Sequence, residues 1–162
     1  MGLFFYLLFS CIIYIIYVIF VIDMIVNNQI IKTKEDQMDY DKILNEAHQA
    51  GWEAGTKKVP TPMMVVQREN PLDDTSDVVQ AWNVPSGICG FASVVTTAHG
   101  NSKFVKHLKK VGEGRKQYYG GYCAKRVREF GQSYEQKVAY AHAFADVLKK
   151  YDIEAYVEDR LD

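Results

Sequence analysis

An uncharged, apolar run near the start of the chain, Leu3 to Ile22 (LFFYLLFSCIIYIIYVIFVI), constrains the fold more than any other feature. As one helix rising about 1.5 Å per residue, it would extend about 30 Å, the thickness of a bilayer's hydrocarbon core. The run lacks the features of a cleaved signal peptide, because no Lys or Arg precedes it and no Ala-x-Ala cleavage site follows it. The run therefore predicts an uncleaved transmembrane anchor over residues 1–26, with residues 3–22 in contact with the lipid bilayer.

Basic residues occur only after this run. Lys32 and Lys34 follow it closely, and no basic residue precedes it. The positive-inside rule then places the C-terminal part in the cytosol. We expect a single-pass membrane protein with a cytosolic C-terminal domain.

The residues after the anchor divide into a tether, 27–62, and a domain, 63–162. Within the tether, residues 36–50 show apolar side chains at helical spacing (Tyr40, Ile43, Leu44 and Ala47), and Gly51 suits the position after a helix end. This pattern predicts an amphipathic helix that packs on the domain or on a partner.

The domain has the patterns of strands and helices in alternation. Apolar or alternating runs predict strands over 63–67, 78–82, 88–98, 122–129 and 153–157. Helices are expected over 103–111, capped by Asn101 or Ser102, and from about 133 to 150, with Ser133 and Gln136 as a capping box. The β-α-β-α-β order from residue 88 predicts a small α/β two-layer sandwich with its helices on one face, with α+β as the alternative.

Residues 87–162 resemble a family of small uncharacterised proteins found in tailed phages and some large DNA viruses. The motifs that carry the resemblance are Gly87-Ile-Cys-Gly-Phe-Ala92, Tyr118-Tyr-Gly-Gly121, Gly131-Gln-Ser-Tyr-Glu-Gln-Lys137, Ala139-Tyr-Ala-His-Ala-Phe-Ala145 and Arg160-Leu-Asp162. The resemblance implies a viral origin and no known activity. Because the family's members usually lack an N-terminal span, this chain looks like the family's module joined to an anchor. The membrane would then be that of a virion or an internal membrane of the host.

Cys89 and His142 are the candidates for catalysis. The neighbourhood of Cys89, Ser86-Gly-Ile-Cys-Gly-Phe-Ala92, is similar to that of a papain-type nucleophile. Such a thiolate is activated at a helix N-terminus beside a histidine, whereas the residues after Cys89 favour a strand. His142 falls among apolar helix residues, where a packed histidine is ordinary. No C-x-x-C or H-x-x-x-H pair occurs, so we expect no metal and no cofactor.

The strongest functional signal is a concentration of basic residues in the domain. Residues 101–128 contain nine Lys and Arg against one acid, Glu113, a local excess of 9 − 1 = +8 in a chain with a formal net charge of −1. The candidate anion- or partner-binding residues form what we call the basic cluster: Lys103, Lys106, Lys110, Arg115, Lys116, Lys125, Arg126 and Arg128. Tyrosines interleave with them, so the cluster could grip phosphates and stack on bases, contact anionic lipid headgroups, or dock an acidic protein.

Three functions are compatible with these patterns. The first is a membrane-anchored structural or interaction protein, a minor virion component that links a capsid or another viral assembly to a membrane. The second is a membrane-tethered enzyme that depends on Cys89. The third is a membrane-tethered nucleic-acid-binding module that uses the basic cluster.

Overall fold

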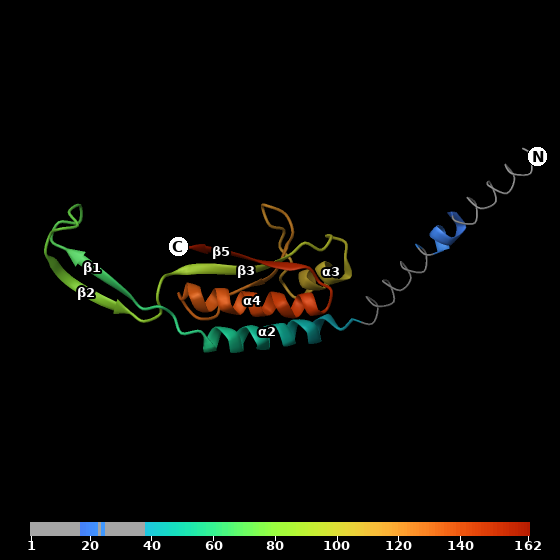
Figure 1. Ribbon diagram of the computed structural model, residues 1–162, viewed down its shortest axis with the longest axis horizontal. Helices are drawn as coiled ribbons and strands as arrows, with labels where there is room; N and C mark the ends of the chain where they lie inside the picture. Colours follow the sequence, from blue (N-terminus) through green and yellow to red (C-terminus); the bar gives the residue numbers. More distant parts are fainter. Residues whose placement is uncertain (1–16, 23, 25–37) are drawn as a thin grey trace, which may run out of the picture. The chain divides into compact units, whose positions relative to one another are not determined.

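The computed structural model describes residues 17–22, 24 and 38–162 (Figure 1). The chain divides into two compact units, Met1–Asp39 and Tyr40–Asp162. The second unit contains three helices and five strands: α2 (Tyr40–Lys57), β1 (Met63–Arg68), β2 (Val78–Val84), β3 (Gly90–Thr96), α3 (Lys103–Lys110), β4 (Tyr122–Arg126), α4 (Tyr134–Lys150) and β5 (Ala155–Leu161).

Most of the predicted transmembrane helix, residues 3–22, lies outside the described residues. The part that is described, residues 17–22, is helical. Within the described part of the chain, no helix is both long enough and apolar enough to cross a membrane. This finding contradicts the predicted single-pass architecture.

The predicted α/β class is also wrong, because the domain is α+β with two separate antiparallel sheets. The larger sheet has three strands in the order β4-β3-β5, and β3 pairs antiparallel with both neighbours. The elements follow the predicted order along the chain. The order of strands and helices along the chain does not show whether neighbouring strands are parallel or antiparallel. Here the strands of the larger sheet are antiparallel.

Helix α4 lies between the three-stranded sheet and α2, so the domain has three layers where two were predicted (Figure 1). Ala92, Val94 and Thr96 of β3 are buried toward α4. On α4 itself, residues on both sides are buried: Lys137, Tyr140, Ala141, Phe144, Ala145, Val147 and Leu148. The broad apolar surface of this helix therefore serves two interfaces.

Helix α2 belongs to the domain and continues beyond its predicted end at residue 50. Gly51 and Gly55 lie inside the helix and are buried against aromatic rings. An added Cβ would lie 2.9 Å from the Tyr140 ring at Gly51 and would clash with the Phe130 ring at Gly55. Both glycines therefore allow close packing of α2, and neither ends the helix.

The two predicted helix caps differ in the structure. The Ser102 side chain accepts a hydrogen bond from the Val105 amide at 3.2 Å and caps α3 as expected. Ser133 precedes α4 without a side-chain cap bond, and its buried hydroxyl has no partner among the described residues. Gln136 instead donates to the Gly55 carbonyl at 3.2 Å, so the predicted capping box is wrong.

Strands β1 and β2 form a separate two-stranded hairpin, which extends away from the layered part of the domain (Figure 1). Its base is held at the start of α4. The Glu135 carboxylate pairs with Lys58 at 2.8 Å and accepts a hydrogen bond from the Thr61 amide at 3.1 Å. The hydrogen bond from Lys58 and those from Thr61 lower the pKa of Glu135 from 4.5 to about 2.

Candidate anion-binding groove

The face of the three-stranded sheet that points away from α4 carries arginine side chains. Directly opposed residues in antiparallel strands point to the same face. Ser93 lies opposite Arg126 on one side and Glu158 on the other, and Phe91 lies opposite Arg160. The register therefore brings two arginines from different strands onto this face.

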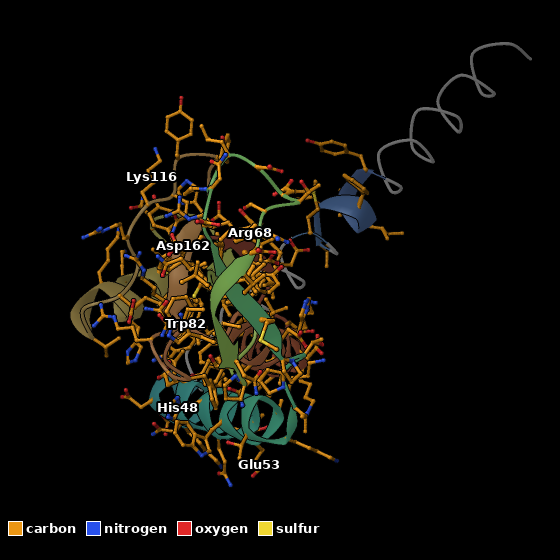
Figure 2. The ribbon with its side chains drawn as sticks, turned by 90° about the vertical axis from the view of Figure 1, so that its left-hand side faces the viewer. His48, Glu53, Arg68, Trp82, Lys116 and Asp162 are labelled. Carbon is orange, nitrogen blue, oxygen red and sulfur yellow. The ribbon has the colours of Figure 1, made fainter. Side chains whose placement is uncertain are left out.

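The loop from 111 to 121, between α3 and β4, adds a third arginine. Backbone hydrogen bonds at 2.8 Å join the Gly114 amide to the Cys123 carbonyl and the Cys123 amide to the Arg115 carbonyl, which fixes Arg115 beside β4. The loop returns at Gly121, whose φ is 77° and where a Cβ would lie 2.7 Å from the Thr96 carbonyl oxygen. Figure 2 shows Lys116 of this loop on the side of the domain away from α2, where His48 and Glu53 lie.

Together these segments enclose a hollow of about 600 Å³, which we call the arginine groove. Its basic side chains are Arg115, Arg126, Arg128 and Arg160, and its acidic side chains are Glu113, Glu158 and Asp159.

None of the four arginines forms an ion pair within the described part of the domain. Within the described residues, no carboxylate lies within 4.0 Å of the guanidinium groups of Arg115, Arg126 or Arg128, and all three side chains are exposed. The fourth, Arg160, lies over the Phe91 ring with 5.0 Å between its Cζ and the ring centroid. Unpaired guanidiniums that converge on one hollow are suited to bind phosphate or carboxylate oxygens.

The Phe91 ring is contacted by two cations, Arg160 and Lys137. The Lys137 ammonium lies 5.4 Å from the Phe91 centroid and donates to the Gly90 carbonyl at 2.9 Å. Lys137 is only 5% exposed. Lys137 is not among the residues that line the groove, so it contacts Phe91 without being accessible to a ligand.

Two exposed tyrosines lie on the same loop as Arg115. The side chains of Tyr118 and Tyr119 are 93% and 86% exposed, and their rings meet edge to face with centroids 5.0 Å apart. Tyr119 also lines the groove. Large aromatic rings so exposed beside guanidinium groups are typical of surfaces that stack on bases.

The structure separates the predicted basic cluster into groups. Arg115, Arg126 and Arg128 line the groove, whereas Lys103, Lys106 and Lys110 lie on α3 and are not among the lining residues. Lys125 forms an ion pair with Glu129 at 3.0 Å. Burial alone would raise the pKa of Glu129, but hydrogen bonds from Lys125 and from backbone amides hold it below its ordinary value.

Sequence reasoning missed Arg160 as a groove residue. It lies 32 positions after Arg128 in the sequence, and only the β3–β5 register places it in this groove. The predicted final strand ends at residue 157, whereas β5 extends to Leu161, and the sequence does not show which strand pairs with which.

The two candidates for catalysis are not brought together. Cys89 is half-buried and forms a β-bridge with Ser133 at the start of α4. His142 lies on α4 nine residues after Ser133, a helical distance of about 13 Å. It is exposed, contrary to the expected packing. Among the described residues, no group of three His, Cys, Asp or Glu side chains could hold a metal ion.

No protein-family model, curated protein or solved structure matches this chain. The resemblance to the phage and viral family, and the capsid-linking role that depended on it, therefore stay predictions.

Proposed function

We propose that the domain is a binding module for single-stranded nucleic acid and that the arginine groove is its binding surface. The observation that carries the proposal is the set of three unpaired guanidiniums, on Arg115, Arg126 and Arg128, around one groove whose loop also exposes two tyrosine rings. Guanidinium groups bind phosphate oxygens in a bidentate manner, and aromatic rings stack on unpaired bases.

The balance of charge in the groove sets the expected strength of binding. Four arginines face three carboxylates, a surplus of 4 − 3 = +1. Such a groove attracts a polyanion weakly and in a strongly salt-dependent way. We expect a dissociation constant in the range of non-specific binding, about 10⁻⁴ to 10⁻⁶ M at physiological salt.

The test is fluorescence anisotropy of a labelled oligothymidine titrated with the full chain. Arg126→Gln/Arg128→Gln removes two groove charges, and we expect binding to weaken about tenfold at low salt, since the loss of about 1.4 kcal/mol is tenfold. The matched control, Lys149→Gln/Lys150→Gln, removes the same charge from the exposed end of α4 and is expected to leave binding within about twofold. Equal losses in both variants would refute the proposal.

A second comparison separates nucleic acid from polyanions in general. Removing the rings in Tyr118→Ala/Tyr119→Ala is expected to weaken oligothymidine binding, because stacking contributes about 1–3 kcal/mol per base. Heparin has no bases, so its binding is expected to be unchanged by this substitution. If both ligands respond alike, the tyrosines do not stack and the site is a general anion site.

The exposed hairpin favours a second candidate function, that of an interaction protein. Met64, Val79 and Trp82 of the hairpin are 64%, 66% and 43% exposed. This candidate does not compete with the first, because none of the hairpin residues lines the arginine groove.

A further inference from the structure

The hairpin of β1 and β2 exposes apolar side chains on both of its faces. The register places Val65 opposite Trp82 on one face and Val66 opposite Ala81 on the other, and all four residues are exposed. An isolated two-stranded hairpin is marginally stable in water, and stability needs further strands or a packed face. Within the described residues, each strand of this hairpin pairs only with the other.

Both free edges of the hairpin lack the usual protection against pairing. Natural edge strands carry lysine, proline or inward-pointing charges that block the addition of another strand. The one charged residue in either strand is Arg68, at the tip end of β1, where its guanidinium donates to the Ser76 carbonyl at 2.6 Å. The remaining residues, 63–67 (MMVVQ) and 78–84 (VVQAWNV), contain no charge and no proline. These edges are therefore available to accept a further strand.

Charge is segregated along the length of the hairpin. The connection at its tip, residues 69–77, contains four acids, Glu69, Asp73, Asp74 and Asp77, and no basic residue. The base follows Lys57, which is exposed in the last turn of α2, whereas the neighbouring Lys58 is paired with Glu135. The six residues of β1 extend about 20 Å, and this length separates the acidic tip from the basic base.

We propose that the hairpin is a self-association surface, in which two copies of this chain pair their hairpins antiparallel about a two-fold axis to form a four-stranded sheet. In that arrangement the tip of each copy lies beside the base of the other, because antiparallel hairpins of equal length overlap end to end. Each acidic tip then meets Lys57 of the partner copy, and the two contacts are equivalent by symmetry.

The charge pattern favours a second copy over an unrelated protein. An unrelated partner would need its own acidic and basic groups at the hairpin's spacing, whereas a second copy supplies them necessarily. Pairing two hairpins also gives each the additional strands that its marginal stability requires. The inference does not depend on the arginine groove, because the hairpin and the groove share no residue.

Sedimentation velocity of the full chain over a range of concentrations tests the proposal. Glu69→Lys/Asp74→Lys/Asp77→Lys changes the formal charge of residues 69–77 from −4 to 3 − 1 = +2, and so reverses the charge of the tip without touching Asp73, whose carboxylate accepts two hydrogen bonds from Thr75. Lys57→Glu reverses the charge of the base. Each variant alone places like charges together, so we expect the dimer dissociation constant of each to rise about tenfold at low salt.

Mixing the two variants gives the decisive result. A lysine-bearing tip then faces a Lys57→Glu base, and the native tip faces the native base, so both contacts are complementary again. We expect the mixture to recover an affinity within about threefold of the native chain. A third variant, Val79→Lys, should abolish pairing at any salt concentration, whereas Val111→Lys, which places a lysine on an exposed valine outside the hairpin, should not.

Three results would overturn the proposal. The first is a native chain that stays monomeric up to about 100 µM, which leaves the hairpin for a different protein. The second is association that is insensitive to all hairpin variants, which places the contact elsewhere in the chain. The third is a mixture that associates no better than either variant alone, which excludes the tip-to-base arrangement.

Discussion

Replacing Gly51 by alanine tests whether α2 packs on α4 as closely as the structure shows. The residue lies in the interior of α2, where alanine is intrinsically more favourable than glycine by about 1 kcal/mol. The added methyl group, however, would lie 2.9 Å from two carbons of the Tyr140 ring and 3.0 Å from Cγ. Because Cγ is at the near end of the side chain, a small rotation of the ring does not relieve the contact.

The Tyr140 ring also has little freedom to move away. Its side chain is fully buried, its hydroxyl lies 2.6 Å from Nδ1 of His48, and its ring stacks on Phe144 with centroids 6.0 Å apart. Overpacking of this kind costs about 1–3 kcal/mol. After subtracting the propensity gain, we expect Gly51→Ala to lower the free energy of unfolding by about 1 kcal/mol and the melting temperature by about 4 °C.

Urea denaturation monitored by circular dichroism measures the change, with two controls. Asn45→Ala lies on the exposed surface of the same helix and should stabilise the domain by about 0.5 kcal/mol. In a Tyr140→Leu background the ring is absent, so Gly51→Ala should be neutral or stabilising there. The reasoning fails if Gly51→Ala raises the stability of the native chain by as much as it does in that background.

Three further predictions concern caps, pH and thiols. Ser102→Ala should lower the free energy of unfolding by about 1 kcal/mol, because it removes the hydrogen bond that caps α3. Ser133→Ala should lower it by less than about 0.5 kcal/mol, because the Ser133 hydroxyl makes no hydrogen bond among the described residues. Equal losses would contradict the assigned geometry. The carboxylate of Glu135 has a lowered pKa, so its contribution to stability is fully present above about pH 4.5 and is lost as the pH falls toward 2. NMR titration of the native chain should show a midpoint near 2. Glu135→Gln should remove this part of the pH dependence of unfolding. Burial raises the pKa of the Cys123 thiol, so alkylation near pH 8 should modify the half-buried Cys89 well before Cys123. Peptide mapping after alkylation measures the two rates. Equal rates would argue against the packing of strand β4.

Local features of the domain could be predicted from the sequence because short-range chemistry determines them. The cap at Ser102, the apolar stripe of α3 and the two strands of the hairpin all follow from residues within a few positions of one another. In each case the deciding interaction is made by a close sequence neighbour or by a repeating pattern, which a single sequence displays.

Features that depend on distant partners could not be predicted. Gly51 resembles a helix terminator in sequence, and only the Tyr140 ring on α4 explains why a glycine is needed inside a helix. The strand order β4-β3-β5 likewise depends on which strands meet after the helices pack, so the fold class was predicted wrongly.

The same distinction applies to the site. A count of charges identified the basic cluster, but it gave equal weight to Lys125, which is paired with Glu129, and to Arg126, which is not. It also omitted Arg160, which reaches the groove only through the pairing of β5 with β3. Charge density in a sequence therefore indicates a region, and three-dimensional pairing decides which cations are available to a ligand.

The central claim, that the arginine groove binds single-stranded nucleic acid through its unpaired guanidiniums, is tested most directly by the salt dependence of oligothymidine binding. If four groove arginines contact phosphates, the logarithm of the association constant should fall against the logarithm of salt concentration with a slope of about −2.8, because each contact with a single strand contributes about −0.7. Replacing Arg115, Arg126 and Arg128 with glutamine should reduce the magnitude of this slope by about 2. A slope near zero in the native chain, or one that these substitutions leave unchanged, would contradict the account.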